Sequence, residues 1–338
     1  MSQEKWFCKK TKEMVDYKGR KNKLMPENEE FVNICRLDAK QLKNFLIMEL
    51  YGYGYKEVIV GDGYAYARGS IPFCLTAHMD TVHAETVRDT YEFNKNGDYL
   101  ISSPQGIGGD DRCGVYMILN LLKKGYKPYI VFCEEEEKGC IGSEKFCKTE
   151  LIKELSDCRY IIELDRGNGN DAVYYNCDNK DFEKFITSTT GYKTATGSCS
   201  DISELCPACG VAGVNLSCGY YNAHTLGEYV NMTEMKHTQD VVEKLLNTEC
   251  VQYEYIEKKK YSYLDDYYYG GYYRTPQKDE KYCSYWDFVV LDIMYKDKNG
   301  ETQSVTIDGV DEHECWSMFF INNPNVCFND LIDWDVVA

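Results

Sequence analysis

GIGGDDRCGVYMILNLLKKGYKPYIVFCEEEEKG, residues 106–139, contains the pattern that decides the fold. Within it, VYMILNLLKK (residues 115–124) predicts a helix, because its apolar residues recur at helical spacing before a basic end. PYIVFCEEEE (residues 128–137) predicts a buried strand that runs directly into a loop. A helix followed by a short, fully apolar strand is typical of a sheet that is covered on both faces.

The same alternation continues on both sides of this stretch. Strands are expected in IPFCLTA (residues 71–77) and in CRYIIELD (158–165), and a helix is expected in FCKTELIKELSD (146–157). Strands that alternate with helices predict an α/β fold, here a three-layer αβα sandwich with a mostly parallel central sheet. In such sheets, ligands bind outside the carboxyl ends of the strands.

The two ends of the chain differ from this centre. Residues 1–50 are expected to be helical, since apolar residues lie three and four apart towards the end of that segment. Residues 251–285 are rich in Tyr and charge and predict an irregular joint. Residues 286–338 predict a small β-rich C-terminal appendage with strands around a Lys-Asn-Gly turn. The sequence therefore predicts one α/β domain over residues 1–250, the joint and the appendage.

The composition excludes several classes of partner. The 338 residues contain 55 Asp and Glu against 38 Lys and Arg, a formal charge of −17. Nucleic acids and anionic membrane surfaces both require a basic face, so neither is expected as a partner. The acid excess is either a solubilising surface or a set of carboxylates that hold cations. The 17 cysteines are scattered and no signal peptide is evident, which favours reduced thiols and a cytoplasmic location.

Histidines and carboxylates recur where the predicted strands end. Each can be explained alone: a single His as a hydrogen-bonded structural residue, an Asp pair as a helix cap, four glutamates as a solvated run, an Asp as a turn residue. Together they recur in order, and the carboxylate sites are roughly one βα unit apart. Two imidazoles and three carboxylates suit two zinc ions bridged by one carboxylate. These positions are His78-Met-Asp80, Asp110-Asp111, Glu134–Glu137, Asp165 and His224.

In this combination the chain resembles the co-catalytic di-zinc exopeptidases, the clan of peptidase T-like tripeptidases, zinc aminopeptidases and carboxypeptidase G-like enzymes. The resemblance covers roughly residues 38–248. It rests on five matches, which are His78-Met-Asp80-Thr-Val, Gly109-Asp110-Asp111-Arg-Cys-Gly114, Glu136-Glu137-Lys-Gly139, Ile-Glu-Leu-Asp165 and Asn222-Ala-His224-Thr-Leu-Gly-Glu228-Tyr.

The resemblance implies a ligand role for five residues. His78 and Asp165 would hold one zinc ion, and Glu137 and His224 would hold the other. Asp110 would bridge the two metals. Zinc is the implied cofactor, and Co²⁺ or Mn²⁺ are alternatives that the same ligands would accept.

Two further residues receive catalytic roles from the resemblance. Asp80 would orient the ring of His78 through its second nitrogen. Glu136 would act as general base on a metal-bridging water and then as acid to the leaving amine. The family motif ends in x-Gly, and Gly139 therefore selects Glu136 and Glu137. A shift of one residue, to Glu135 and Glu136, remains the alternative.

Residues near the last ligand are candidates for substrate binding. Asn222, Tyr220 and Tyr221 flank His224, and Arg166 follows Asp165, where it would meet a substrate carboxylate or balance local acid. His83 lies outside the motif and is expected to be a loop residue.

One feature departs from part of the clan. Peptidase T-like and carboxypeptidase G-like enzymes insert a lid or dimerisation domain between the fourth ligand and the last His. About 60 residues separate Asp165 from His224 here, too few for such a domain. The architecture is therefore expected to follow the single-domain aminopeptidases. Substrate residues or dimer contacts that a lid would supply are not expected, and the oligomeric state stays open.

The sequence thus predicts a zinc-dependent exopeptidase, an aminopeptidase rather than a carboxypeptidase, that hydrolyses short peptides. An acidic rim would attract a free α-amino group. A related zinc amidohydrolase or deacylase, acting on N-acyl amino acids or small amides, is the alternative enzyme. A non-catalytic binding protein with a vestigial metal site is the alternative outside enzymes.

Overall fold

The structure is a computed structural model. It describes residues 26–95, 97–258, 289–309 and 330–336, the short strands at 5–8, 13–16 and 21–23, and residues 319, 323 and 326. Among these residues, no helix combines the length and apolar character that crossing a membrane requires. The cysteines whose side chains are described are free thiols.

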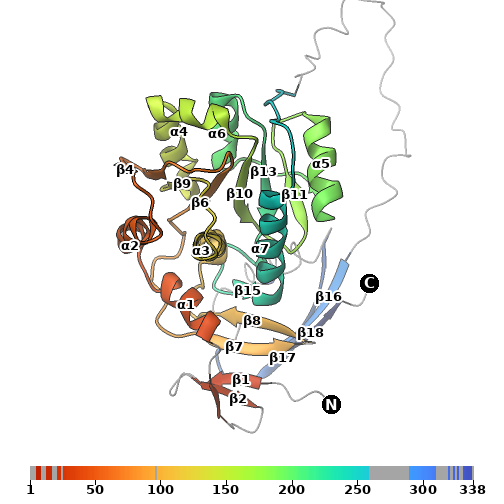
Figure 1. Ribbon diagram of the computed structural model, residues 1–338. Helices are drawn as coiled ribbons and strands as arrows, with labels where there is room; N and C mark the ends of the chain where they lie inside the picture. Colours follow the sequence, from red (N-terminus) through yellow and green to blue (C-terminus); the bar gives the residue numbers. More distant parts are fainter. Residues whose placement is uncertain are drawn as a thin grey trace, which may run out of the picture.

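The centre of the fold is an eight-stranded sheet (Figure 1). Its order is β12-β11-β13-β10-β6-β9-β5-β4, and its four central strands, β13, β10, β6 and β9, run parallel. The edges are mixed, because β5 runs antiparallel to β9, and β11 runs antiparallel to β13. The strands are β4 (Val58–Gly61), β5 (Tyr64–Ala67), β6 (Cys74–His78), β9 (Tyr129–Cys133), β10 (Ile161–Arg166), β11 (Asp171–Val173), β12 (Lys193–Ala195) and β13 (Gly213–Ser217).

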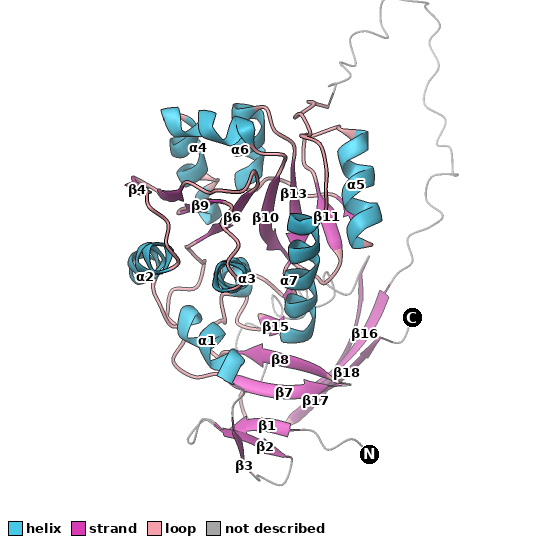
Figure 2. Ribbon diagram, viewed as in Figure 1, coloured by secondary structure: helices cyan, strands magenta, loops and turns pink. Residues whose placement is uncertain are grey.

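Helices cover both faces of this sheet, which confirms the predicted three-layer αβα sandwich (Figure 2). The central strands are almost fully buried, as near-continuous apolar runs predict. One face packs against α2 (Ala39–Gly52), α3 (Gly109–Lys123), α5 (Lys180–Thr190) and α7 (Met232–Asn247), and α1 (Pro26–Cys35) packs on α3. The other packs against α4 (Ile141–Cys147), the 3₁₀ segment η2 (Glu150–Asp157) and α6 (Asp201–Cys209).

The N-terminal segment corrects one expectation. Helices begin only at Pro26, and the described residues before it form strands, so the prediction of helix throughout residues 1–50 is wrong there. These strands join a second sheet of order β14-β15-β8-β7-β1-β2-β3, in which β1 pairs with β7. Because that partner lies some 85 residues further along the chain, local periodicity carries no signal for it. The strands are β1 (Lys5–Cys8), β2 (Glu13–Asp16), β3 (Lys21–Lys23), β7 (Tyr91–Lys95), β8 (Asp98–Ser102), β14 (Tyr220–Tyr221) and β15 (Tyr229–Asn231).

The C-terminal strands form a third, antiparallel sheet, as predicted for the appendage. It has three strands of order β17-β16-β18, which are β16 (Val289–Lys296), β17 (Thr302–Gly309) and β18 (Leu331–Val336). Ile293 and Leu331 pack against Leu100 and Tyr229 of the second sheet. The joint predicted at 251–285 lies outside the described residues beyond 258. Residues up to 258 follow the edge of the central fold through bridges at Glu254 and Glu257.

No lid lies between Asp165 and His224. This part of the chain is fully described and forms strands and helices of the central sandwich, from β11 to β13, followed by β14. The short spacing in the sequence therefore corresponds to core elements alone.

Candidate metal and catalytic site

The predicted site residues meet at the carboxyl edge of the central sheet. His78 is the last residue of β6, and Asp165 is near the end of β10, its neighbour. Glu137 lies in the 3₁₀ turn η1 (Glu136–Lys138) that follows β9. Asp110 is in the first turn of α3, and His224 is in the loop between β14 and β15. Parallel neighbours end at the same edge, and this brings together residues that are far apart in the chain.

Asp110 lies between the two histidines. Its Oδ1 is 2.9 Å from Nε2 of His78, and its Oδ2 is 3.2 Å from Nε2 of His224. Each carboxylate oxygen therefore faces a different imidazole. The peptide bond between Asp110 and Asp111 is cis.

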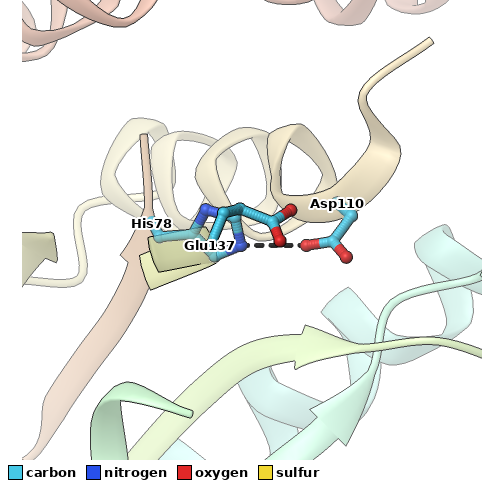
Figure 3. A group of neighbouring side chains, drawn as sticks. All are labelled: His78, Asp110 and Glu137. Atoms are coloured by element: carbon cyan, nitrogen blue, oxygen red, sulfur yellow. Dashed lines mark hydrogen bonds and ion pairs between the residues drawn. The ribbon is translucent and has the colours of Figure 1, made fainter. Parts of the chain in front are cut away.

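Two more carboxylates complete the cluster, one beside each imidazole. Asp165 Oδ1 lies 3.3 Å from Nε2 of His78, and Glu137 Oε2 lies 3.0 Å from Nε2 of His224. Figure 3 shows the side chains of His78, Asp110 and Glu137 converging, with the contact between His78 and Asp110 drawn. The structure thus brings together all five residues named as ligands; their roles as ligands stay a prediction.

The cluster is mostly buried, and its charges perturb one another. His78 is 1% exposed, whereas the side chain of His224 is 53% exposed and faces solvent. Hydrogen bonds to Asp110 and Glu137 raise the pKa of His224 to about 10. Burial and the negative charge of Asp110 raise the pKa of Asp165 to about 7. Clustered carboxylates of this kind require cationic partners.

Asp80 links His78 to the turn that carries the glutamates. Its Oδ1 lies 3.4 Å from Nδ1 of His78, the nitrogen that faces away from the cluster. Its two oxygens also accept the backbone N–H groups of Glu136 and Glu137, at 3.3 and 3.4 Å. Asp80 is therefore placed to orient both the ring and the glutamate turn, the position that its predicted role requires.

Asp111 lies close enough to form an alternative metal-binding group with His78 and Asp165. Its oxygens, however, already accept backbone N–H groups, Oδ2 from His78 at 3.2 Å and Oδ1 from Gly114 at 2.9 Å. The oxygens of Asp110 face ring nitrogens instead. We therefore assign Asp111 to joining β6 to the start of α3, and Asp110 to the ligand cluster.

Glu136 lies beside the cluster, but it makes none of the contacts with His78 or His224 that are described above. Burial and the negative charge of Asp165 raise the pKa of its carboxyl group to about 8. The Cys140 thiol is 3.8 Å from its Oε1. Glu135, the alternative in the shifted register, contacts Lys138 and Lys145 on the surface instead. The geometry therefore favours Glu136 over Glu135 as the carboxylate next to the metal ligands.

Two neighbours of Asp165 escaped the sequence reasoning. The Ser200 hydroxyl donates to its Oδ2 at 2.8 Å. The Asn215 side chain accepts from its backbone N–H at 2.9 Å and donates to its carbonyl at 3.1 Å. Both come from elements that lie beside β10 only in the folded chain, so no local motif marks them.

The predicted substrate-binding residues differ in how many hydrogen bonds they make within the chain. The buried Tyr220 donates its hydroxyl to the Asp165 carbonyl at 3.3 Å. Tyr221 donates to Glu234 of α7 and stacks on Tyr229, whose ring centroid lies 5.1 Å away.

Asn222 and Arg166 differ in exposure. Asn222 is fully buried, and its Oδ1 has no partner among the described residues. The Arg166 side chain is 32% exposed and lies 3.5 Å from Asp171. A substrate role for these residues stays a prediction.

Part of the chain matches a known protein family. Residues 65–204 match peptidase family M28, a span that contains all predicted ligands except His224. This confirms the resemblance to the zinc aminopeptidase-like clan that the motif predicts. No curated protein matches the sequence.

Among solved structures, the chain is similar to the aminopeptidase PepT from Bacillus cereus, with a TM-score of 0.50, 15% identity and coverage of 65% of this chain and 97% of that one. It is also similar to a tripeptidase from Staphylococcus aureus, with a TM-score of 0.51, 14% identity and coverage of 65% and 96%. A TET aminopeptidase from a Thaumarchaeota archaeon has a TM-score of 0.50, 10% identity and coverage of 65% and 95%. At these identities the similarity establishes the shared fold.

Proposed function

Because the chain is a metallopeptidase, we propose that it is a zinc-dependent aminopeptidase that hydrolyses short peptides with a free N-terminus. One observation carries this proposal. The carboxylate of Asp110 faces a different imidazole with each oxygen, and one further carboxylate stands beside each imidazole. This arrangement divides into two ligand groups that share Asp110, as two adjacent metal ions require.

The donor atoms fit zinc in type and spacing. Imidazole nitrogen and carboxylate oxygen are both zinc ligands, and bond lengths of about 2.0–2.2 Å in a tetrahedron place neighbouring ligand atoms ~3.3 Å apart. The nitrogen–oxygen distances in the cluster are 2.9, 3.0, 3.2 and 3.3 Å. His78 and Asp165 would hold one ion, Glu137 and His224 the other, with Asp110 shared. Co²⁺ or Mn²⁺ would suit the same ligands.

Zinc would supply the acidity that activates water near neutral pH and the positive charge that stabilises the developing oxyanion. The chain supplies the proton transfer. Glu136, beside the ligands, would accept the proton of the attacking water and return it to the leaving amine. Asp80 would keep the His78 ring and the glutamate turn in position through the contacts described above.

The charge balance near the cluster favours a cationic substrate group. Arg166 is already opposed by Asp171 at 3.5 Å. Arg112 is 2% exposed, and its guanidinium donates to the carbonyls of Met79 and Leu37. Because Arg112 is engaged by these carbonyls and the charge of Arg166 is opposed by Asp171, a protonated α-amino group would be attracted more than a carboxylate. This is the physical reason for preferring an aminopeptidase.

A deacylase acting on N-acyl amino acids is the second candidate. It is favoured by Arg166, whose buried Nε has no partner among the described residues and would donate a hydrogen bond to a substrate carboxylate. A panel of free and N-acylated di- and tripeptides separates the candidates. Cleavage of the free peptides alone, abolished by a chelator and restored by zinc, is the expected result. Cleavage of acylated substrates alone would favour the deacylase.

Metal content is measured on the same preparation, with two zinc ions per chain expected. Protein that binds no zinc and cleaves none of the substrates after zinc is added would contradict both enzymes and favour a binding protein with a vestigial site.

A further inference from the structure

Glu228 is a fully buried carboxylate that the mechanism above does not use. It lies four residues after His224, immediately before β15, and its side chain is 0% exposed. A buried carboxylate is costly unless its oxygens accept hydrogen bonds. Its contacts therefore indicate what it stabilises.

Both oxygens of Glu228 accept hydrogen bonds from the loop that leads into α3. Oε2 accepts the Gly108 N–H at 3.0 Å, and Oε1 accepts the Asp110 N–H at 3.0 Å. The first N–H groups of a helix have no partner within the helix, so a carboxylate there satisfies them and opposes the positive end of the helix dipole. Here the carboxylate bridges the N–H groups of the two residues on either side of Gly109, and one of its two donors is the backbone of Asp110 itself.

Glu228 also contacts the side chain of His83. Its Nε2 lies 2.5 Å from Oε2 of Glu228, and its side chain is 7% exposed. The ring packs against Gly106, where an added Cβ would lie only 2.2 Å from it and where φ is +80°. His83 is a loop residue, as the sequence predicts, but its ring is buried against this turn.

The β14–β15 segment also packs directly on the loop. A Cβ added to Gly109 would lie 2.7 Å from Val230, 2.8 Å from Tyr220 and 3.2 Å from Oε1 of Glu228. The glycine at this position therefore allows Glu228 to approach the backbone. One short segment thus carries His224 on one side of the cluster and holds the backbone of Asp110 on the other.

From these contacts we infer that Glu228, held by His83, is the positioning residue that fixes Asp110 between the two imidazoles and so sets the metal affinity of the site. The inference rests on the proposed function, because it concerns the same ligands. A carboxylate accepts from both Gly108 and Asp110 at once. The amide of Glu228→Gln presents an N–H group to one of these donors, so one hydrogen bond is lost and the Asp110 backbone shifts.

The test compares Glu228→Gln with the wild-type protein and with Glu92→Gln. Glu92 is equally buried, at 0% exposure, but lies in β7 and contacts Asn28 away from the cluster, so it controls for the loss of a buried carboxylate. Zinc affinity is measured by competition with a chromophoric chelator, and the Co²⁺-loaded proteins are compared by visible absorption. Folding is checked by thermal unfolding of the metal-free proteins.

We expect Glu228→Gln to fold, to bind zinc at least tenfold more weakly and to show an altered Co²⁺ spectrum, with Glu92→Gln unchanged in both. On zinc-saturated protein, kcat should fall more than KM changes. Wild-type affinity together with a wild-type spectrum in Glu228→Gln would overturn the inference. If Glu228→Gln does not fold, His83→Gln provides the test, because it retains both backbone contacts of Glu228. We expect His83→Gln to lose less zinc affinity than Glu228→Gln would. An unchanged zinc affinity in His83→Gln would overturn the inference.

These readouts separate the two proposals. Wild-type protein that binds zinc but cleaves no peptide contradicts the proposed function, while the comparison of affinities still tests the role of Glu228. Wild-type protein that cleaves peptides, with Glu228→Gln equal to it in affinity and spectrum, contradicts the inference alone. Wild-type protein that binds neither Zn²⁺ nor Co²⁺ contradicts both the proposed function and the inferred role of Glu228.

Discussion

Glu136 and Glu137 are adjacent in the chain, but the fold gives them different surroundings. Glu137 contacts His224 at 3.0 Å, whereas Glu136 lies beside the cluster next to Cys140. Burial and the charge of Asp165 raise the pKa of Glu136, and bound cations would oppose that effect. The proposed ligand and the proposed proton acceptor thus follow one another in a single turn of 3₁₀ helix.

Glu136→Gln should therefore lower kcat by about 10²-fold or more while zinc remains bound, because a general base is lost and no ligand is removed. Peptide hydrolysis and metal content are measured on the same sample. Glu135→Gln is the matched control, since Glu135 pairs with Lys138 and Lys145 on the surface. A larger loss in Glu135→Gln than in Glu136→Gln would instead support the shifted register.

At the scale of elements, α1 and β7 meet through a buried polar contact. Asn28 of α1 donates to Oε2 of Glu92 at 3.2 Å, and Oε1 of Glu92 has no partner among the described residues. Burial raises the pKa of Glu92 to about 7, from an ordinary value of 4.5. The folded protein therefore binds more protons than the unfolded chain between these values, and stability falls as the pH rises through that window.

Glu92→Gln removes this ionisation. We expect the variant to gain stability relative to wild type as the pH rises from 5 to 8, by on the order of 3 kcal/mol at the upper end. Thermal unfolding at several pH values measures it. The exposed Glu29→Gln on the same helix is the control and should show no such trend. A stability difference between Glu92→Gln and wild type that is independent of pH would show that Glu92 ionises normally in the fold.

The C-terminal sheet is attached through a small apolar cluster. Ile293 is 0% exposed within it, whereas its neighbour Met294 is 41% exposed. Ile293→Ala should destabilise the attachment of β16–β18 by about 2–5 kcal/mol, because it removes a buried side chain. Amide hydrogen exchange should rise in these strands, with zinc binding unchanged. Met294→Ala, the control, should leave exchange as in wild type. An equal effect of both substitutions would contradict this packing.

For the whole molecule, the proposed metal site links five segments of the central fold that are far apart in the chain. The predicted ligands come from the end of β6, the start of α3, the segment after β9, the end of β10 and the β14–β15 loop. A metal ion held by residues from all five segments would bind the folded chain and not the unfolded chain. Binding of this kind stabilises the fold through mass action.

Removing metal should accordingly lower the melting temperature. At free zinc about 100 times the dissociation constant, the stabilisation is ~2.7 kcal/mol. Differential scanning calorimetry with zinc and with a chelator measures the difference, which should shrink in His224→Ala because one ligand is missing. A melting temperature that the chelator leaves unchanged would mean that the cluster holds no metal that contributes to folding.

Local pattern was sufficient to predict the centre of the fold and to predict that the candidate ligands lie close together. Apolar strands alternating with helices predict a parallel sheet, and the ends of its strands must meet at one edge, so His78 and Asp165 could be brought together from sequence order alone. The x-Gly signal likewise favoured Glu136 over Glu135.

Tertiary structure alone decided the rest. β1 pairs with β7, Glu228 accepts from the Asp110 backbone, and Ile293 packs near Tyr229. Each of these depends on a partner far away in the chain, whereas periodicity reports only the neighbours within a few residues. The order of residues along the chain is enough to indicate which side chains could bind metal. How those side chains are held in place depends on contacts that exist only once the chain has folded.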